Sequence, residues 1–121
     1  RIEVLGSISE RDLNNYLSRA TVLLQTNDDR GFGMPALETA ACGCSFIIPE
    51  GQGVCNLFSN EKEGFFTREK DTERIISLLG RFLSDQVFAR QMGKAAWERV
   101  KNNYSWRIHA QEIINLARGL K

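Results

Sequence analysis

The sequence predicts an α/β fold, in which a parallel sheet of about three or four strands is flanked by helices and followed by a helical carboxyl-terminal end. Two observations carry this prediction. Residues 1–50 alternate short apolar runs with amphipathic helical patterns, which is typical of βαβ units and their crossover connections. Residues 71–121 then hold capped helical patterns without a further strand-like run.

The first predicted strand is Ile2–Leu5, and a turn at Gly6 leads from it to a helix over Glu10–Arg19. Ser9 precedes that helix and Asp12 follows three residues later, which resembles a capping box. Apolar residues at helical spacing predict one buried helix face. This face consists of Leu13, Tyr16, Leu17 and Ala20.

Two continuous apolar runs follow, "TVLLQT" at residues 21–26 and "SFIIP" at residues 45–49. Runs of this length are typical of strands in a parallel sheet that is covered on both sides. Between them, Pro35 suits the first turn of a helix and Gly43 the position just past its end. "GQGVCNLF" then predicts a loop with a short helix, and Gly64–Thr67 a brief last strand.

The remaining chain predicts three helices, capped at their amino termini by Asp71, Asp85 and Ser105. Each carries an apolar stripe, and we expect the stripes of the first two helices to face inward. The stripes are Ile75, Ile76, Leu79, Phe82 and Leu83; Phe88, Met92, Ala95 and Ala96; and Trp106, Ala110, Ile113, Ala117 and Leu120.

Composition limits the kinds of function. A hydrophobic fraction of 42% with 26% charged residues is typical of a soluble globular domain, and a net charge of +1 gives no overall attraction to nucleic acid. The apolar runs are too short to span a bilayer and no secretory signal begins the chain, so we expect a cytoplasmic location. Cys42, Cys44 and Cys55 are expected to be reduced structural thiols rather than metal ligands.

The stretch "DRGFGMPALETAACG" at residues 29–43 predicts a ligand site. Gly31 and Gly33 let the backbone approach a ligand closely, just before a helix that begins near Pro35. The helix amino terminus then lies at the carboxyl edge of a parallel sheet, which favours a phosphate or a hydroxylated ligand. Glu38, one turn into the helix, offers a carboxylate to two vicinal ribose hydroxyls. From spacing alone, a tight βα turn with a solvated glutamate fits equally well.

The same residues carry a family resemblance. Residues 31–43, "GFGMPALETAACG", closely resemble the signature of the GT-B-fold retaining glycosyltransferases of family four, also called glycosyl transferases group 1. "VLGSIS", "GFFT" and "YSW" extend the resemblance in the family's order, so that it covers essentially the whole chain. It implies that residues 1–121 are the later part of a Rossmann-like, carboxyl-terminal donor-binding domain.

The resemblance also implies a substrate and its contacts. The donor would be a nucleoside-diphosphate sugar, and the acceptor a glycan or lipid-linked molecule bound through an amino-terminal domain that this chain lacks. On the matching positions, Glu38 would hold the ribose, the backbone of residues 31–33 would contact the donor sugar, and Gly33 and Met34 would lie near the pyrophosphate. The full-length protein would be a hexosyltransferase without a cofactor or metal, cytoplasmic or peripheral at the inner face of the membrane.

Three departures from the family pattern qualify this reading. Arg30 replaces the first of the two signature glutamates, Ser45 stands where the family often has proline, and Asn56 lies near the place of another donor-facing glutamate. Arg30 either binds an acidic donor sugar or helps the diphosphate leave, or is unimportant, or marks a non-catalytic relative that serves as a nucleotide-binding or protein-interaction module. Because the acceptor domain and the first donor-domain strands are absent, we expect the 121 residues alone to be inactive.

Overall fold

The computed structural model describes residues 1–27 and 31–119 of the chain. Three strands form a parallel sheet in the order β1-β2-β3, with β1 at Val22–Leu24, β2 at Ser45–Pro49 and β3 at Phe65–Thr67. Leu23 lies opposite Phe46, and Ile48 opposite Phe66. The predicted α/β class with a parallel sheet is therefore correct.

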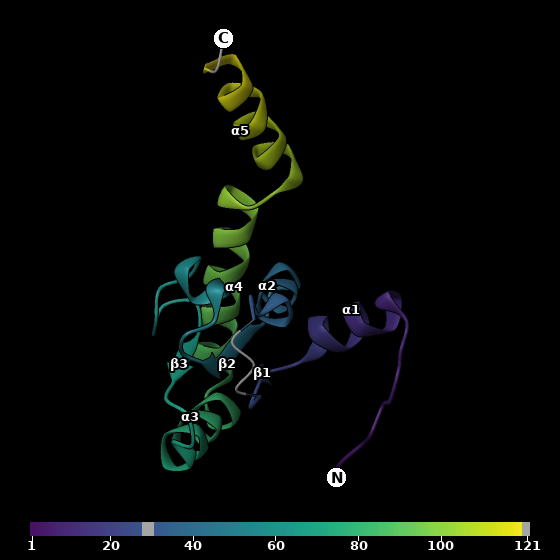
Figure 1. Cartoon of the computed structure of the whole chain (residues 1–121). Helices are drawn as coiled ribbons and strands as arrows, with labels where there is room; N and C mark the ends of the chain where they lie inside the picture. Colours follow the sequence, from purple (N-terminus) through teal and green to yellow (C-terminus); the bar gives the residue numbers. More distant parts are fainter. Residues whose placement is uncertain (28–30, 120–121) are drawn as a thin grey trace.

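Helices lie before, between and after these strands along the chain (Figure 1). They are α1 at Glu10–Arg19, α2 at Met34–Ala41, α3 at Thr72–Ser84, α4 at Gln86–Asn103 and α5 at Trp106–Gly119, with a short 3₁₀ helix η1 at Gly53–Asn56. The predicted caps are confirmed: the side chains of Ser9, Asp71, Asp85 and Ser105 each accept a hydrogen bond from the backbone N–H three residues further on. These caps use groups close in sequence, which is why the sequence predicts them well.

Strand β2 is the centre of the core, because both of its faces are buried. Phe46 and Ile48 face one cluster, together with α2, η1 and Ala96 of α4. Ile47 faces the other cluster, which includes β3, α3 and Met92 of α4. Successive side chains of β2 point to opposite faces of the sheet, so one face packs against α2 and the other against α3. Helix α4 contributes side chains to both faces.

The predicted strand at Ile2–Leu5 is wrong. These residues are extended but unpaired, and Ile2 and Val4 are 94% and 91% exposed. A strand requires a neighbour for its backbone N–H and C=O groups, and within the described residues none of β1, β2 and β3 pairs with this segment. The apolar pattern of Ile2–Leu5 is that of a strand, but such a pattern does not by itself provide the neighbouring strand that pairing requires.

Several predicted apolar stripes are also only partly buried. Leu17 is the one fully buried residue of the stripe on α1. On α3 the residues that enter the core are Leu78 and Phe82, whereas Ile76 and Leu83 are mostly exposed. Helix α5 has no buried residue along its described length and extends away from the sheet (Figure 1). Periodicity identifies an apolar side, but burial depends on whether another element covers it.

Candidate functional site

The predicted site lies where α2 begins. Strands β1 and β2 are parallel, so their carboxyl ends share one edge of the sheet, and α2 starts above that edge after the loop that follows β1. Gly33 occupies the N-cap position of α2 and offers no side chain to its first N–H groups. Pro35 has no N–H, and the N–H of Ala36 donates to the carbonyl of Gly33 at 3.1 Å. In the described residues the first turn of α2 therefore leaves the N–H of Met34 to a ligand.

Gly33 is required there for two reasons. Its φ of 90° lies in the left-handed region that residues with a Cβ adopt reluctantly. In addition, a Cβ on Gly33 would lie 2.5 Å from Oε1 of Gln52 and 2.7 Å from Cγ1 of Val54. The loop before α2 is thus packed directly against the segment that contains η1.

Backbone hydrogen bonds fix the same contact. The N–H of Val54 donates to the carbonyl of Phe32 at 2.7 Å, and the N–H of Gly53 donates to the carbonyl of Gly31 at 3.3 Å. A Cβ on Gly53 would also approach the Phe32 ring to 2.9 Å. Residues 31–33, which we call the glycine loop, are therefore positioned by η1 rather than by their own side chains.

The side chains around the glycine loop are available to a ligand. Phe32 and Met34 are 44% and 49% exposed, and Glu38 is exposed on the same face of α2 as Met34, four residues earlier. The structure thus brings together Gly31, Phe32, Gly33, Met34 and Glu38, all named from the sequence. Arg30, the sixth predicted site residue, lies outside the described residues.

A cavity of about 690 Å³ adjoins Glu38. It lies between α1, α2 and α4, and is lined by Asn14, Ser18, Glu38, Ala41, Cys42, Gly43 and Trp97. Sequence reasoning did not connect Asn14, Ser18 or Trp97 with Glu38. The only sequence signal was the spacing of four residues between Asn14 and Ser18, which places both on one face of α1.

The cysteines show no sign of catalytic activation. All three are free, and Cys44 is buried while Cys42 and Cys55 are partly buried. Burial raises the pKa of the Cys44 thiol to about 11 and also raises the pKa of the Cys55 thiol. Among the described residues, no group of three or more His, Cys, Asp or Glu side chains is arranged to hold a metal ion.

The sheet, the glycine loop and the open helix terminus define an α/β domain of the kind found in GT-B glycosyltransferases. The family described as "Glycosyl transferase-like" matches residues 1–115, and the chain belongs to this family. The family resemblance inferred from the signature residues is therefore confirmed.

Two solved structures share the fold. Sucrose-phosphate synthase from Thermosynechococcus elongatus has a TM-score of 0.88 and 29% identity, over 99% of this chain and 30% of that chain. The carboxyl-terminal domain of a glycosyl transferase group 1 family protein from Francisella tularensis has a TM-score of 0.74 and 18% identity, over 87% of this chain and 53% of that chain. The second similarity supports the fold alone.

Curated relatives agree with this family assignment. A sucrose synthase from Melioribacter roseus is 27% identical in an alignment of 104 residues that covers 83% of this chain and 13% of the relative. A GDP-mannose-dependent phosphatidylinositol monomannoside mannosyltransferase from Corynebacterium glutamicum is 25% identical in an alignment of 122 positions that covers 95% of this chain and 32% of the relative. The chain thus spans at most about a third of the length of these two proteins.

In the part of the chain that the structure describes, none of the helices is both long enough and apolar enough to cross a bilayer.

Proposed function

We propose that the chain binds a nucleoside-diphosphate sugar and acts as the donor-binding domain of a hexosyltransferase. The whole protein would transfer the sugar, with retention of anomeric configuration, to a glycan or lipid-linked acceptor. The observation that carries this proposal is the uncapped amino terminus of α2, with the exposed Glu38 one turn into the helix.

The chemistry of this site suits such a donor. The N–H of Met34 and the positive end of the helix dipole favour the diphosphate. The glycine loop allows close approach to the backbone, and the half-exposed Phe32 and Met34 offer apolar surface beside it. The carboxylate of Glu38 can accept hydrogen bonds from both hydroxyls of a ribose, each of them strengthened by its charge.

The name of one relative supports the donor class, because that protein is a GDP-mannose-dependent mannosyltransferase. Transfer by the whole protein would need no metal, as the family resemblance implies, and the 121 residues alone would be inactive. We also propose a cytoplasmic or peripheral membrane location, as expected for a protein that acts on lipid-linked acceptors.

Arg30 favours a second candidate function. The family signature has a glutamate at this position, so a cation reverses the charge beside the donor sugar. The protein would then be a non-catalytic relative that keeps nucleotide affinity and serves a partner. An Arg30→Glu variant of the full-length protein separates the two: loss of a native transferase activity supports the catalytic role, whereas a gain of activity indicates a degenerated site.

The donor site itself is tested by calorimetric titration of the full-length protein with UDP, GDP and ADP. We expect one nucleotide to bind and Glu38→Ala to weaken it by roughly tenfold or more, because hydrogen bonds to a charged group are lost. Glu112→Ala, which removes an exposed carboxylate from α5, is the matched control and should leave affinity unchanged. Absence of binding by all three nucleotides, or equal losses in both variants, would contradict the proposal.

A further inference from the structure

Helix η1 connects the glycine loop to the end of α4. At its first half, Gly53 and Val54 donate backbone hydrogen bonds to Gly31 and Phe32, as described above. At its end, the N–H of Leu57 donates to the carbonyl of Val54 at 2.9 Å, which closes the short helix. Any group that fixes Leu57 therefore acts on the segment that holds the glycine loop.

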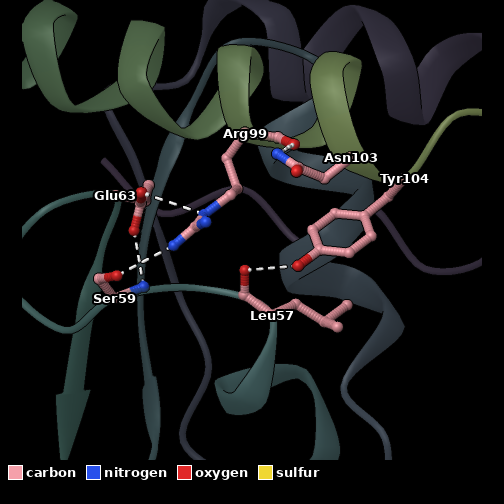
Figure 2. Close-up of polar contacts among 6 residues, drawn as sticks. All are labelled: Leu57, Ser59, Glu63, Arg99, Asn103 and Tyr104. Carbon is pink, nitrogen blue, oxygen red and sulfur yellow. Dashed lines mark hydrogen bonds and ion pairs between the residues drawn. The ribbon is translucent and has the colours of Figure 1, made fainter.

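Tyr104 is such a group. Its hydroxyl donates a hydrogen bond of 3.0 Å to the carbonyl of Leu57, which is 47 residues away in the sequence (Figure 2). Tyr104 is the C-cap of α4, and its own N–H donates to the carbonyl of Val100. The hydroxyl thus joins the end of a long, well-packed helix to the end of η1.

A partly buried ion pair holds the residues that follow Leu57. The guanidinium of Arg99, on α4, lies 3.4 Å from the carboxylate of Glu63, whose side chain is only 3% exposed. The same carboxylate accepts from the N–H of Ser59 at 2.6 Å, and Arg99 donates to the Ser59 hydroxyl at 3.0 Å (Figure 2). These contacts fix residues 59–63 on α4. The Tyr104 hydrogen bond therefore acts on an η1 segment whose following residues are already held in place.

We propose that Tyr104 is a positioning residue for the glycine loop, acting through Leu57 and η1, and thereby for the nucleotide-sugar donor. The donor part of this inference rests on the proposed function, whereas the mechanical part rests only on the contacts of the described residues. Tyr104 touches no residue of the glycine loop in any contact given above. Its effect must therefore pass through the hydrogen bonds of Gly53 and Val54.

Hydrogen exchange measures those two hydrogen bonds directly, because the amide protons of Gly53 and Val54 exchange with solvent only when these bonds open. In the full-length protein, Tyr104→Phe removes the hydroxyl and keeps the ring. We expect exchange at Gly53 and Val54 to accelerate by about three- to tenfold, the usual value of one hydrogen bond, through a local opening. The β2 amides Ile47 and Ile48 report the accompanying loss of global stability. Tyr16→Phe, at an exposed tyrosine of α1, should change none of these rates.

A second measurement separates positioning from general stability. Asp85→Ala removes the cap of α4 at its other end and destabilises the protein without touching η1. We expect Tyr104→Phe to raise the donor KM by about two- to fivefold with kcat unchanged, and Asp85→Ala to leave KM unchanged. If the protein proves inactive, the Kd of the nucleotide that binds replaces KM.

The outcomes are distinguishable. Unchanged exchange at Gly53 and Val54, or an equal acceleration of these two amides in Asp85→Ala, would overturn the positioning role whatever the ligand is. Local acceleration with an unchanged donor KM or Kd would overturn its effect on the donor. If no nucleotide binds even the unmodified protein, the proposed function fails, and the exchange rates alone decide whether Tyr104 positions the glycine loop.

Discussion

The two faces of β2 are built differently. On the α2 side, the helices contribute the small side chains Ala36, Ala40 and Ala96, which pack against Phe46 and Ile48. On the α3 side, three aromatic rings lie together: Phe82 is 5.9 Å from Phe65 and 5.1 Å from Phe88, measured between ring centroids. Both faces exclude water, but only the α2 face carries the candidate site.

The difference has a physical meaning. Small residues let backbones approach closely, and on the α2 side a Cβ on Gly93 would collide with the carbonyl of Gly43, while one on Gly33 would collide with Gln52 and Val54. Such contacts fix a loop in position but contribute little apolar area. Large rings bury much apolar area in a single side chain. We infer that both faces supply stability and that the α2 face, in addition, positions the ligand loop.

The largest expected effect comes from the α3 face. Phe82 is fully buried, so Phe82→Ala should lower the free energy of unfolding by about 3–5 kcal/mol through lost burial and a residual cavity. The half-exposed Phe32 is the matched control on the α2 face, and Phe32→Ala should cost much less stability. Urea unfolding measures the stability loss of both variants, and nucleotide titration measures how well Phe32→Ala still binds nucleotide. A larger stability loss for Phe32→Ala would reverse the comparison.

A smaller loss of stability, but a complete loss of binding, is expected for Gly33→Ala. The left-handed backbone and the contacts with Gln52 and Val54 together should cost about 2–4 kcal/mol, and the displaced loop should no longer bind nucleotide. Gly51 is the control, since its φ of 91° is nearly the same but a Cβ there meets nothing within 4 Å. Equal losses for Gly33→Ala and Gly51→Ala would show that backbone strain, not close packing, matters.

The smallest expected effect depends on pH and concerns the start of β2. Burial raises the pKa of the Cys44 thiol from 9.0 to about 11, so the folded chain keeps this proton where the unfolded chain loses it. The resulting stability is complete below about pH 9 and declines as pH rises toward 11, by about 1–2 kcal/mol at pH 10.5. Urea midpoints of the unmodified protein and Cys44→Ala should therefore converge with rising pH. A constant difference between them would contradict this.

Local interactions explain which parts of the fold were predictable. The caps at Ser9, Asp71 and Asp85 involve a side chain and an N–H three residues later, and they gave helix starts that the structure reproduces. The signature around Gly33 likewise predicted an uncapped helix start after a glycine loop. Whether Glu38 and the glycine loop bind a donor stays a prediction, and so does the assignment of residues 1–121 to the later part of a larger domain.

Contacts between distant segments explain what was missed. The apolar pattern of Ile2–Leu5 is that of a strand, yet in the described residues no strand pairs with it. An apolar stripe was predicted on α5, but the sequence did not decide whether another element covers it, and none of its described residues is buried. Nothing in the sequence linked Tyr104 to Leu57, or Asn14 to the cavity beside Glu38, because those residues lie far apart along the chain.

The sequence was enough to predict the order and type of nearly all elements, the helix caps, the family and the residues of the candidate site. Each of these depends on groups a few residues apart or on a continuous signature. The folded structure was needed to show which apolar faces are covered, why Gly33 has no room for a side chain, and how α4 holds η1 against the glycine loop. Those properties depend on which distant segments meet, and that is settled by packing and by the pairing of buried polar groups.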